Sequence, residues 1–567
     1  ARNTFLAGAI PTRAMITGGV CSAYGLSSWG KLFSDRQLVF LLTSSGLLDL
    51  VRKQAETDCA SAGRSGAEDY GRAVATYLSF ALSRSADRGS TLCSWDSSPK
   101  MEALRNTFGR QALPMVWDFA EGNPFSESSG SWINNVYWVA LAIERLAAIG
   151  SGEAVQRDAQ SVEIEGRVIS ADPPYYDNIS YAELSDFFYV WLRRGLVWER
   201  NGALATILTP KAEELVVAPH RHGGREAAES YFLDGMTKAM ARFGTQSEPT
   251  TPISIYYAFK QSDTKADEGT ASGGWETFLQ ALMDAGLGLT GTWPMRTELS
   301  NRMVGVGTNA LASSIVLVCR PRLSSASTVA RKDFLRELDR ALPIALTDMT
   351  ADLEAPVAPV DLAQAAIGPG MAIFSKYKAV LEADGEPMTV HNALVHINKA
   401  IDNFFAEAEG ELDADTRFCI AWFQQYGFDA GPFGEADVLA RAKGTAVDGM
   451  KDAGIIDAGK GKVRLFKIKD LPKKWDPASD ERVPIWEATH QMCRALGESE
   501  STAGALLARM PQKQDAIRHL AYRLYTLCER TKRAEEARAY NELVTSWPSI
   551  IEESRKLPPM GTQIGLI

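Results

Sequence analysis

Four consecutive residues, Asp172, Pro173, Pro174 and Tyr175, are the ones best placed to do chemistry. They follow the short β-branched run Arg167 to Ala171, which predicts a strand. Ligands of open α/β sheets bind beyond the carboxyl ends of strands. The two prolines fix the backbone, so the Asp172 carboxylate and the Pro173 carbonyl point in set directions. These two acceptors suit the two N–H groups of an exocyclic amine on a nucleic-acid base.

Such an amine is a poor nucleophile because its lone pair is delocalised into the ring. Hydrogen bonds to Asp172 and Pro173 would draw the nitrogen toward a tetrahedral state and align it with a methyl sulfonium. Tyr175 offers a flat face on which an extruded base can stack. The four residues therefore predict methyl transfer to a base amine. The alternative is a proline-stiffened turn, although the expected strand before the motif and helix after it favour the catalytic interpretation.

Residues close to the motif are candidates for the base pocket. Tyr176, Asn178 and Tyr181 follow it directly, and Asn178 is equally suited to a turn. Lys211 lies farther along and could reach a phosphate. Within the predicted helix Tyr181 to Arg194, four aromatic residues are expected to form core rather than a stacking platform: Phe187, Phe188, Tyr189 and Trp191.

A second group of polar residues follows the predicted strand Leu287 to Trp293. If the strands are parallel, this group lies at the sheet edge where Asp172 ends. We expect contacts to the flipped base or its phosphates, with surface salt bridges as the alternative. The group comprises Arg296, Glu298, Asn301 and Arg302.

The bulk composition limits the class of protein. The chain has 567 residues, too many for one hydrophobic core. Its net charge of −10 requires any DNA contact to come from local basic patches. The seven cysteines show no C-x-x-C pair, which predicts a reducing cytoplasm and no metal site. No apolar run is long enough to span a membrane.

The elements that must position the motif form an α/β region. Strands and helices alternate from about residue 162, which predicts a mainly parallel sheet. Besides those already named, the expected elements are the helices Ala227 to Phe243 and Trp275 to Ala285 and the strands Ile253 to Phe259 and Ser314 to Cys319. We expect five regions along the chain: a mostly helical segment (1–160), the catalytic α/β region (161–325), a helical linker (326–410), a winged-helix candidate (411–475) and a helical end (476–567).

The winged-helix candidate rests on three predicted helices followed by a Gly-flanked basic hairpin, Gly459 to Ile468. The alternative is a solvated hairpin on a helical domain. Positive charge is concentrated there, on Lys460, Lys462, Arg464, Lys467, Lys469, Lys473 and Lys474.

The run ADPPYYDNISYAELSDFFYVWLRR, from Ala171 to Arg194, resembles the adenine-specific DNA methylases that have a zinc-ribbon region and an amino-terminal domain of unknown function. Further stretches agree, among them YGLSSWGKLFSDRQL (24–38), RNTFGRQALPMVWDFAEGNPF (105–125), TWPMRTELSNRM (292–303) and VDLAQAAIGPGMAIFSKY (360–377). The resemblance covers nearly the whole chain. It implies a Rossmann-like methyltransferase fold, S-adenosylmethionine as the donor beside Asp172 and Pro173, and N6 of adenine in DNA as the acceptor. Some members belong to restriction or phage-defence systems, so defence proteins are expected partners.

The sequence departs from this family in one respect. The glycine-rich loop that holds the donor lies upstream of the motif in the family, but no strand–G-x-G–helix unit precedes Asp172. The zinc-ribbon cysteines are also missing. We therefore expect this chain to correspond to the carboxyl-terminal portion, with the donor loop carried by an upstream portion. The clusters Gly368-Pro369-Gly370 and Gly305-Val306-Gly307 stand in the wrong context for that loop and are expected to be structural.

Two alternatives stay open. The acceptor could be N4 of cytosine or an RNA base, although Asp at the first motif position favours adenine. The chain could instead be a DNA-binding or scaffold component of a defence complex that is inactive by itself.

Overall fold

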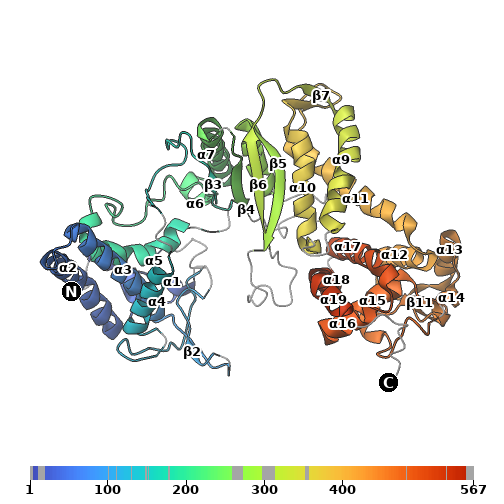
Figure 1. The fold of residues 1–567 in the computed structure, drawn as a ribbon, viewed down its shortest axis with the longest axis horizontal. Helices are drawn as coiled ribbons and strands as arrows, with labels where there is room; N and C mark the ends of the chain where they lie inside the picture. The colour runs from blue at the N-terminus through green and yellow to red at the C-terminus, as the bar shows by residue number, and fades with distance from the viewer. Residues whose placement is uncertain are drawn as a thin grey trace, which may run out of the picture. The chain divides into compact units, whose positions relative to one another are not determined.

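The computed structural model describes residues 4–10, 20–99, 101–109, 112–128, 130–146, 150, 152–176, 179, 181–248, 250–257, 273–296, 313–351, 357–480, 482–531 and 533–556. The chain forms two compact units (Figure 1). Unit 1 contains residues 1–163 and 174–242, and unit 2 contains residues 164–173 and 243–567. The division falls between Pro173 and Pro174, inside the Asp-Pro-Pro-Tyr motif and within the predicted catalytic region.

Unit 1 is mainly helical, as expected for its amino-terminal part. Its longest helices are α2 (Asp35–Ser61), α3 (Ala67–Arg88), α4 (Trp132–Arg145), α5 (Tyr181–Gly195) and α7 (Arg225–Gln246), the last of which continues into unit 2. Helix α2 begins at a capping box, in which Ser34 Oγ accepts from Gln37 N and the Gln37 side chain accepts from Ser34 N. Shorter elements are η1 (Thr4–Ala7), α1 (Val20–Ala23), η2 (Trp29–Leu32), β1 (Trp95–Asp96), β2 (Ala103–Leu104), η3 (Val197–Glu199) and α6 (Pro219–His222).

The helix that follows the motif supplies the core of unit 1. Phe187 and Trp191 of α5 are buried, and their rings lie 5.8 Å and 5.4 Å from the ring of Phe33. Their cluster also contains Trp29 and Leu41. The prediction that these aromatic residues form core is confirmed.

Unit 2 contains a four-stranded sheet in the order β3-β4-β6-β5. Its strands are β3 (Ser170–Ala171), β4 (Ile253–Tyr257), β5 (Leu287–Arg296) and β6 (Ser313–Pro321), with helix α8 (Gly273–Asp284) between β4 and β5 in the chain. The mixed α/β class is confirmed. The expectation of a mainly parallel sheet is wrong, because β6 is antiparallel to both of its neighbours and only β3 and β4 pair in parallel. Side-chain alternation specifies which face of a strand is buried but not its direction.

Strand β6 reverses direction between two neighbours, so β3, β4 and β5 all point the same way. Their carboxyl ends therefore share one edge of the sheet. Tyr257 of β4 is 2% exposed and stacks on Phe278 of α8, with ring centroids 4.2 Å apart. Helix α8 thus covers one face of the sheet.

Helix α10 (Pro359–Ser375) packs beside β5 (Figure 1). Thr292 Oγ1 donates to the Ala365 carbonyl at 2.9 Å, and Ser375 Oγ accepts from Leu289 N at 2.9 Å. A Cβ at Gly368 would lie only 1.9 Å from Thr292 Oγ1, so this close approach requires glycine. The Gly368-Pro369-Gly370 cluster lies inside α10, which confirms its structural role. The Gly305 cluster lies outside the described residues.

Two helices and a small parallel sheet complete the middle of unit 2. They are α9 (Arg331–Ala351), α11 (Val390–Ala408) and the paired strands β7 (Thr328–Ala330) and β8 (Ala379–Leu381). The short helix η5 (Glu409–Glu411) follows α11.

The next segment has the element order helix–strand–helix–helix–strand–strand. Its elements are α12 (Ala414–Tyr426), β9 (Gly431–Pro432), α13 (Phe433–Lys443), α14 (Val447–Asp452), β10 (Ile456–Gly459) and β11 (Lys462–Leu465), and the antiparallel sheet has the order β10-β11-β9. This is the element order expected for the winged-helix candidate, which is called the winged helix below, with β10 and β11 as its wing.

Helices complete the described part of unit 2. They are α15 (Ile485–Glu498), α16 (Glu500–Leu507), α17 (Gln514–Arg530), α18 (Ala534–Thr545) and α19 (Trp547–Arg555), with the short helices η6 (Ile468–Asp470) and η7 (Pro511–Lys513). Asp413 and Thr416, at the start of α12, accept hydrogen bonds from the backbone N–H groups of Ile485 and Trp486 at the start of α15. The winged helix and the following helices are therefore joined by buried polar contacts. Nowhere in the described residues is a helix both long and apolar enough to cross a membrane.

Candidate functional site

Asp172 follows β3 directly and is exposed. The segment before it runs parallel to β4 beyond the two residues of the strand itself, because Ser254 N donates to the Ile169 carbonyl at 3.1 Å and an isolated bridge joins Arg167 to Ser247. The motif therefore begins at the carboxyl end of a sheet strand, as its spacing predicts. Pro173 is half-buried.

The two tyrosines after the prolines differ in burial. Tyr175 is half-buried, whereas Tyr176 is 9% exposed and packs edge-on against Phe232 of α7 at 5.2 Å. The Tyr176 carbonyl accepts from Val217 N at 2.8 Å. Burial and the neighbouring carboxylate of Glu229 raise the pKa of the Tyr176 hydroxyl. Tyr176 thus anchors the chain after the motif within unit 1.

The remaining predicted site residues have varied positions. Tyr181 is the first residue of α5 and is 38% exposed. Arg296 is the last residue of β5. Four predicted site residues lie outside the described residues: Asn178, Glu298, Asn301 and Arg302. Their predicted contacts to the base stay a prediction.

Lys211 makes internal contacts. Its Nζ lies 2.8 Å from an oxygen of Asp186, a carboxylate on α5 that is 1% exposed, and donates to the Thr209 carbonyl at 2.9 Å. The other Asp186 oxygen accepts from Thr209 N at 2.8 Å. The ammonium predicted to reach a phosphate therefore neutralises a buried carboxylate.

A second ion-pair cluster lies close to the first in the chain. Arg221 of α6 hydrogen-bonds to Glu183 of α5 and to Glu214, the latter at 2.6 Å. Burial alone would lower the pKa of Arg221, but the two carboxylates raise it above its usual value. Glu214 also accepts from Ala182 N at 2.9 Å, so the cluster fixes the start of α5. Sequence reasoning did not identify these partners, because they come from segments that are apart in the chain.

The register of the sheet relates the motif to the end of β5. Ala171 of β3 pairs with Ile255 of β4. Ile255 pairs with Leu317 of β6, and Leu317 pairs with Thr292 of β5. Asp172 is therefore level with Trp293, three strand spacings or about 14 Å away. Trp293 and Met295 are 63% and 47% exposed. These exposed apolar side chains at the shared edge were not predicted as site residues. The sequence pattern that indicates them is the pair of large apolar residues, Trp293 and Met295, in alternate positions at the end of the strand.

The implied donor would need a glycine-rich turn between a strand and a helix. Among the described residues, no strand leads through a turn with two or more glycines into a helix, which is the cradle that the methionine part of the donor would need. The residues after β3 are prolines and tyrosines instead. Among the described residues, the motif supplies the Asp172 carboxylate and the Pro173 carbonyl as two neighbouring hydrogen-bond acceptors.

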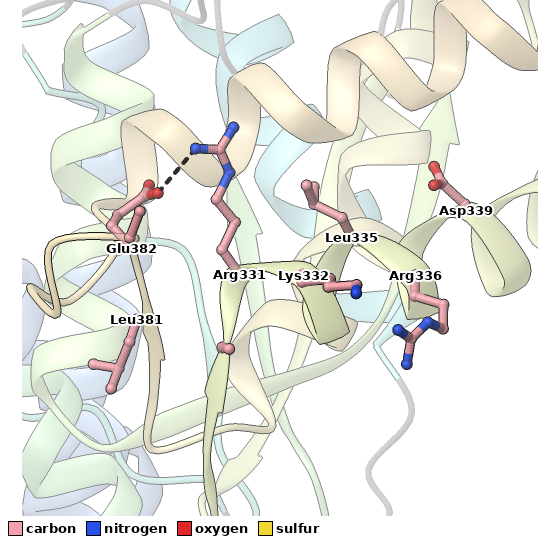
Figure 2. A pocket seen from close by; sticks show the side chains of 9 residues that line it. Arg331, Lys332, Leu335, Arg336, Asp339, Leu381 and Glu382 are labelled. Carbon is pink, nitrogen blue, oxygen red and sulfur yellow. Dashed lines mark hydrogen bonds and ion pairs between the residues drawn. The ribbon is translucent and has the colours of Figure 1, made fainter.

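A hollow of about 650 Å³ lies at the start of α9, beside β8 (Figure 2). Arg331 of this hollow is paired with Glu382 at 3.3 Å, and Arg336 is paired with Asp333 at 3.1 Å. No predicted site residue lines it. These carboxylates neutralise the two arginines of the hollow, so the arrangement does not favour binding of an anion.

The described residues gather no group of three His, Cys, Asp or Glu side chains that could hold a metal ion. All seven cysteines are buried and unpaired. Burial raises the pKa of the Cys319 thiol to about 12, so this thiol is a poor nucleophile at neutral pH.

Comparison with known proteins identifies one region of the chain. A family model described as a domain of unknown function, DUF8807, matches residues 413–565. The match begins at Asp413, the N-cap of α12, and includes both the winged helix and helices α15 to α19. No curated protein and no solved structure matches the chain.

Proposed function

We propose that this chain carries the acceptor side of a DNA methyltransferase that modifies N6 of adenine, with S-adenosylmethionine as methyl donor. The observation that carries the proposal is the Asp-Pro-Pro-Tyr motif at the carboxyl end of β3, in a sheet where three of four strands point toward that edge. Ligand sites of open α/β sheets lie at such edges.

The residues of the motif have separate tasks. The exposed Asp172 carboxylate accepts one N–H of the adenine amine, and the Pro173 carbonyl accepts the other. Tyr175 stacks on the extruded base. Methyl transfer to nitrogen needs no nucleophilic side chain, since the base nitrogen is the nucleophile. When bound, the donor supplies the methyl group.

The strand order is compatible with part of a Rossmann-like sheet. A doubly wound sheet of the Rossmann type has the order 3-2-1-4-5-6. If β3, β4 and β5 correspond to its fourth, fifth and sixth strands, they keep that order and a common direction, and β6 is an additional antiparallel strand between the last two. The described sheet then corresponds to the second half of a doubly wound sheet, after the point where the strand order reverses. The glycine-rich donor loop belongs to the first half.

The experiment uses a version of the protein extended upstream to include the donor loop, and it measures transfer of labelled methyl to duplex DNA, followed by nucleoside analysis. Asp172→Ala should lower the yield of N6-methyladenine on the order of 100-fold or more, because a transition-state hydrogen bond to a charged group is lost. Asp234→Ala, which removes an exposed carboxylate on α7, is the matched control and should leave the rate unchanged.

Base extrusion gives a second readout that requires no donor. A duplex with 2-aminopurine in place of the target adenine should become more fluorescent with the parent chain and less so with Asp172→Ala. Methylation by Asp172→Ala at the parent rate, or N4-methylcytosine as the product, would contradict the proposal. Absence of both methyl transfer and extrusion would favour the inactive DNA-binding alternative.

A further inference from the structure

The wing of the winged helix, residues 456–465, presents lysines at a rigid tip. Strands β10 and β11 are joined by Lys460 and Gly461, which both have positive φ, 53° and 74°. Two left-handed residues in a row make a tight two-residue hairpin turn. Asn or Gly is usual at the first position, so a lysine there departs from the conformational preference. The turn therefore places Lys460 at the tip of the hairpin, between the paired residues Gly459 and Lys462.

The exposed lysines of this module lie in two segments of the chain, the wing and the segment that follows it. Lys460 and Lys462 are exposed, and neither has an ion-pair partner among the described residues, whereas Arg464 is neutralised by Asp457 at 3.2 Å and Asp470 at 3.4 Å. Within the wing, residues 456–465, the cations without an ion-pair partner among the described residues are therefore at the tip. Lys469, Lys473 and Lys474 are exposed in the segment that follows.

Helix α14 occupies the position of a recognition helix but does not have the matching charge. It has six residues, and its exposed side chains include Asp448, Lys451 and Asp452. Two carboxylates against one ammonium repel phosphates, and a helix with this charge is poorly suited to the major groove.

We infer that this module binds the phosphate backbone of duplex DNA through the wing tip, Lys460 and Lys462, with α14 held out of the groove. A lysine ammonium binds a phosphate as a point charge, so the contact carries no base specificity. Because the whole chain is acidic, with a net charge of −10, the binding relies on this local patch. The inference goes beyond methyl transfer and does not depend on it.

The experiment uses the full chain and a short fluorescein-labelled duplex, with anisotropy measured between about 50 and 200 mM salt. The test variant is Lys460→Asn with Lys462→Gln, because Asn tolerates the left-handed turn and both changes keep polar side chains. Loss of two phosphate contacts should weaken binding on the order of tenfold and reduce the log–log salt slope by about 2.

The matched control is Lys443→Gln with Lys451→Gln, which removes two lysines of the same module on α13 and α14. It should leave the affinity and the slope unchanged. If the control loses binding while the wing variant does not, α14 is the contact and the inference is wrong. An unchanged slope in the wing variant, or no duplex binding by the parent, would also overturn it.

Two further comparisons distinguish this inference from binding to an acidic polypeptide and from the proposed methyl transfer. Tighter binding of the parent to poly-glutamate than to the duplex would show that an acidic polypeptide is the preferred partner and would overturn the inference. The anisotropy measurement needs neither a methyl donor nor methyl transfer, so a failure of the proposed methyl transfer leaves this result interpretable.

Discussion

Residues near the motif differ in burial and in their contacts although they are close together in the chain. Tyr176 is buried against Phe232 and holds the backbone, while Tyr175 is half-buried. Lys211 and Arg221 are both paired with carboxylates of α5. Sequence position alone does not separate residues that contact a substrate from residues that support the fold.

Tyr175 is expected to act through its ring face. Tyr175→Ala should lower methyl transfer by roughly 5- to 150-fold, because stacking on an extruded base contributes roughly 1–3 kcal/mol. Tyr175→Phe should retain most of the activity, since the ring is kept. The check is the labelled methyl assay, with donor affinity measured in parallel. A phenylalanine variant as inactive as the alanine variant would show that the hydroxyl is essential.

Arg221 is expected to stabilise the start of α5. Its side chain is 11% exposed and that of Glu183 is 3% exposed, so Arg221→Ala leaves the buried Glu183 carboxylate without its guanidinium partner. Such a loss costs about 3–5 kcal/mol. Hydrogen exchange of the α5 amides, followed by mass spectrometry, should show much faster exchange in this variant.

The control for Arg221 is Arg225→Ala. Arg225 is 64% exposed and pairs with Glu229 on the same helix, at i and i+4. Exposed pairs contribute little, about 0–1 kcal/mol, so α5 exchange should stay close to that of the parent. Equal effects of the two variants would contradict the importance of the buried cluster.

Helix α15 carries two buried titratable groups whose pKa values move in opposite directions. Burial lowers the pKa of His490 to about 4, and burial together with the charge of Asp480 raises the pKa of Glu487 to about 8. His490 is neutral, with Nδ1 donating to the Trp486 carbonyl and Nε2 accepting from the Tyr540 hydroxyl at 2.8 Å. Oε2 of Glu487 has no hydrogen-bond partner among the described residues.

The two groups predict opposite pH dependences of stability. The folded pKa of Glu487 is above its ordinary value of 4.5, so its contribution is full below about 4.5 and is lost as the pH rises to about 8. The folded pKa of His490 is below its ordinary value of 6.5, so its contribution is full above about 6.5 and is lost as the pH falls to about 4.

Glu487→Gln should therefore stabilise the protein increasingly as the pH rises from about 5 to about 8. The gain at pH 8 is a few kcal/mol at most, and thermal unfolding followed by tryptophan fluorescence measures it. Glu498→Gln on the same helix is the control, because Glu498 is 52% exposed and paired with Arg494. A pH-independent difference between Glu487→Gln and the parent would show that Glu487 is already ionised in the fold.

At the scale of the whole molecule, the acceptor motif and the donor cradle are not found together in the described residues. The chain alone is expected to bind S-adenosylmethionine weakly, with a dissociation constant well above the micromolar range. Calorimetric titration of the chain with S-adenosylmethionine and with its demethylated product measures this. Micromolar binding to either would contradict the expectation and would place a donor site in this chain.

The sequence by itself determined the local features. The helix over 181–195, the strands at 253–257 and 313–321, and the basic hairpin all lie where periodicity and turn residues predict them, and the amino-terminal part is mainly helical as expected. The motif at the end of β3 was also predicted, because a β-branched run followed by prolines marks a strand end. These properties depend on residues close together in the chain.

Only the tertiary structure decided the rest. The antiparallel direction of β6, the pairing of Lys211 with Asp186 and of Arg221 with Glu183 and Glu214, and the close contact of Gly368 with Thr292 all join distant segments. A charged side chain has the same signature in the sequence whether it faces solvent, a phosphate or a buried carboxylate. Which of these it meets is decided by packing, because the cost of burying a charge is met only where an opposite charge from another element is brought beside it.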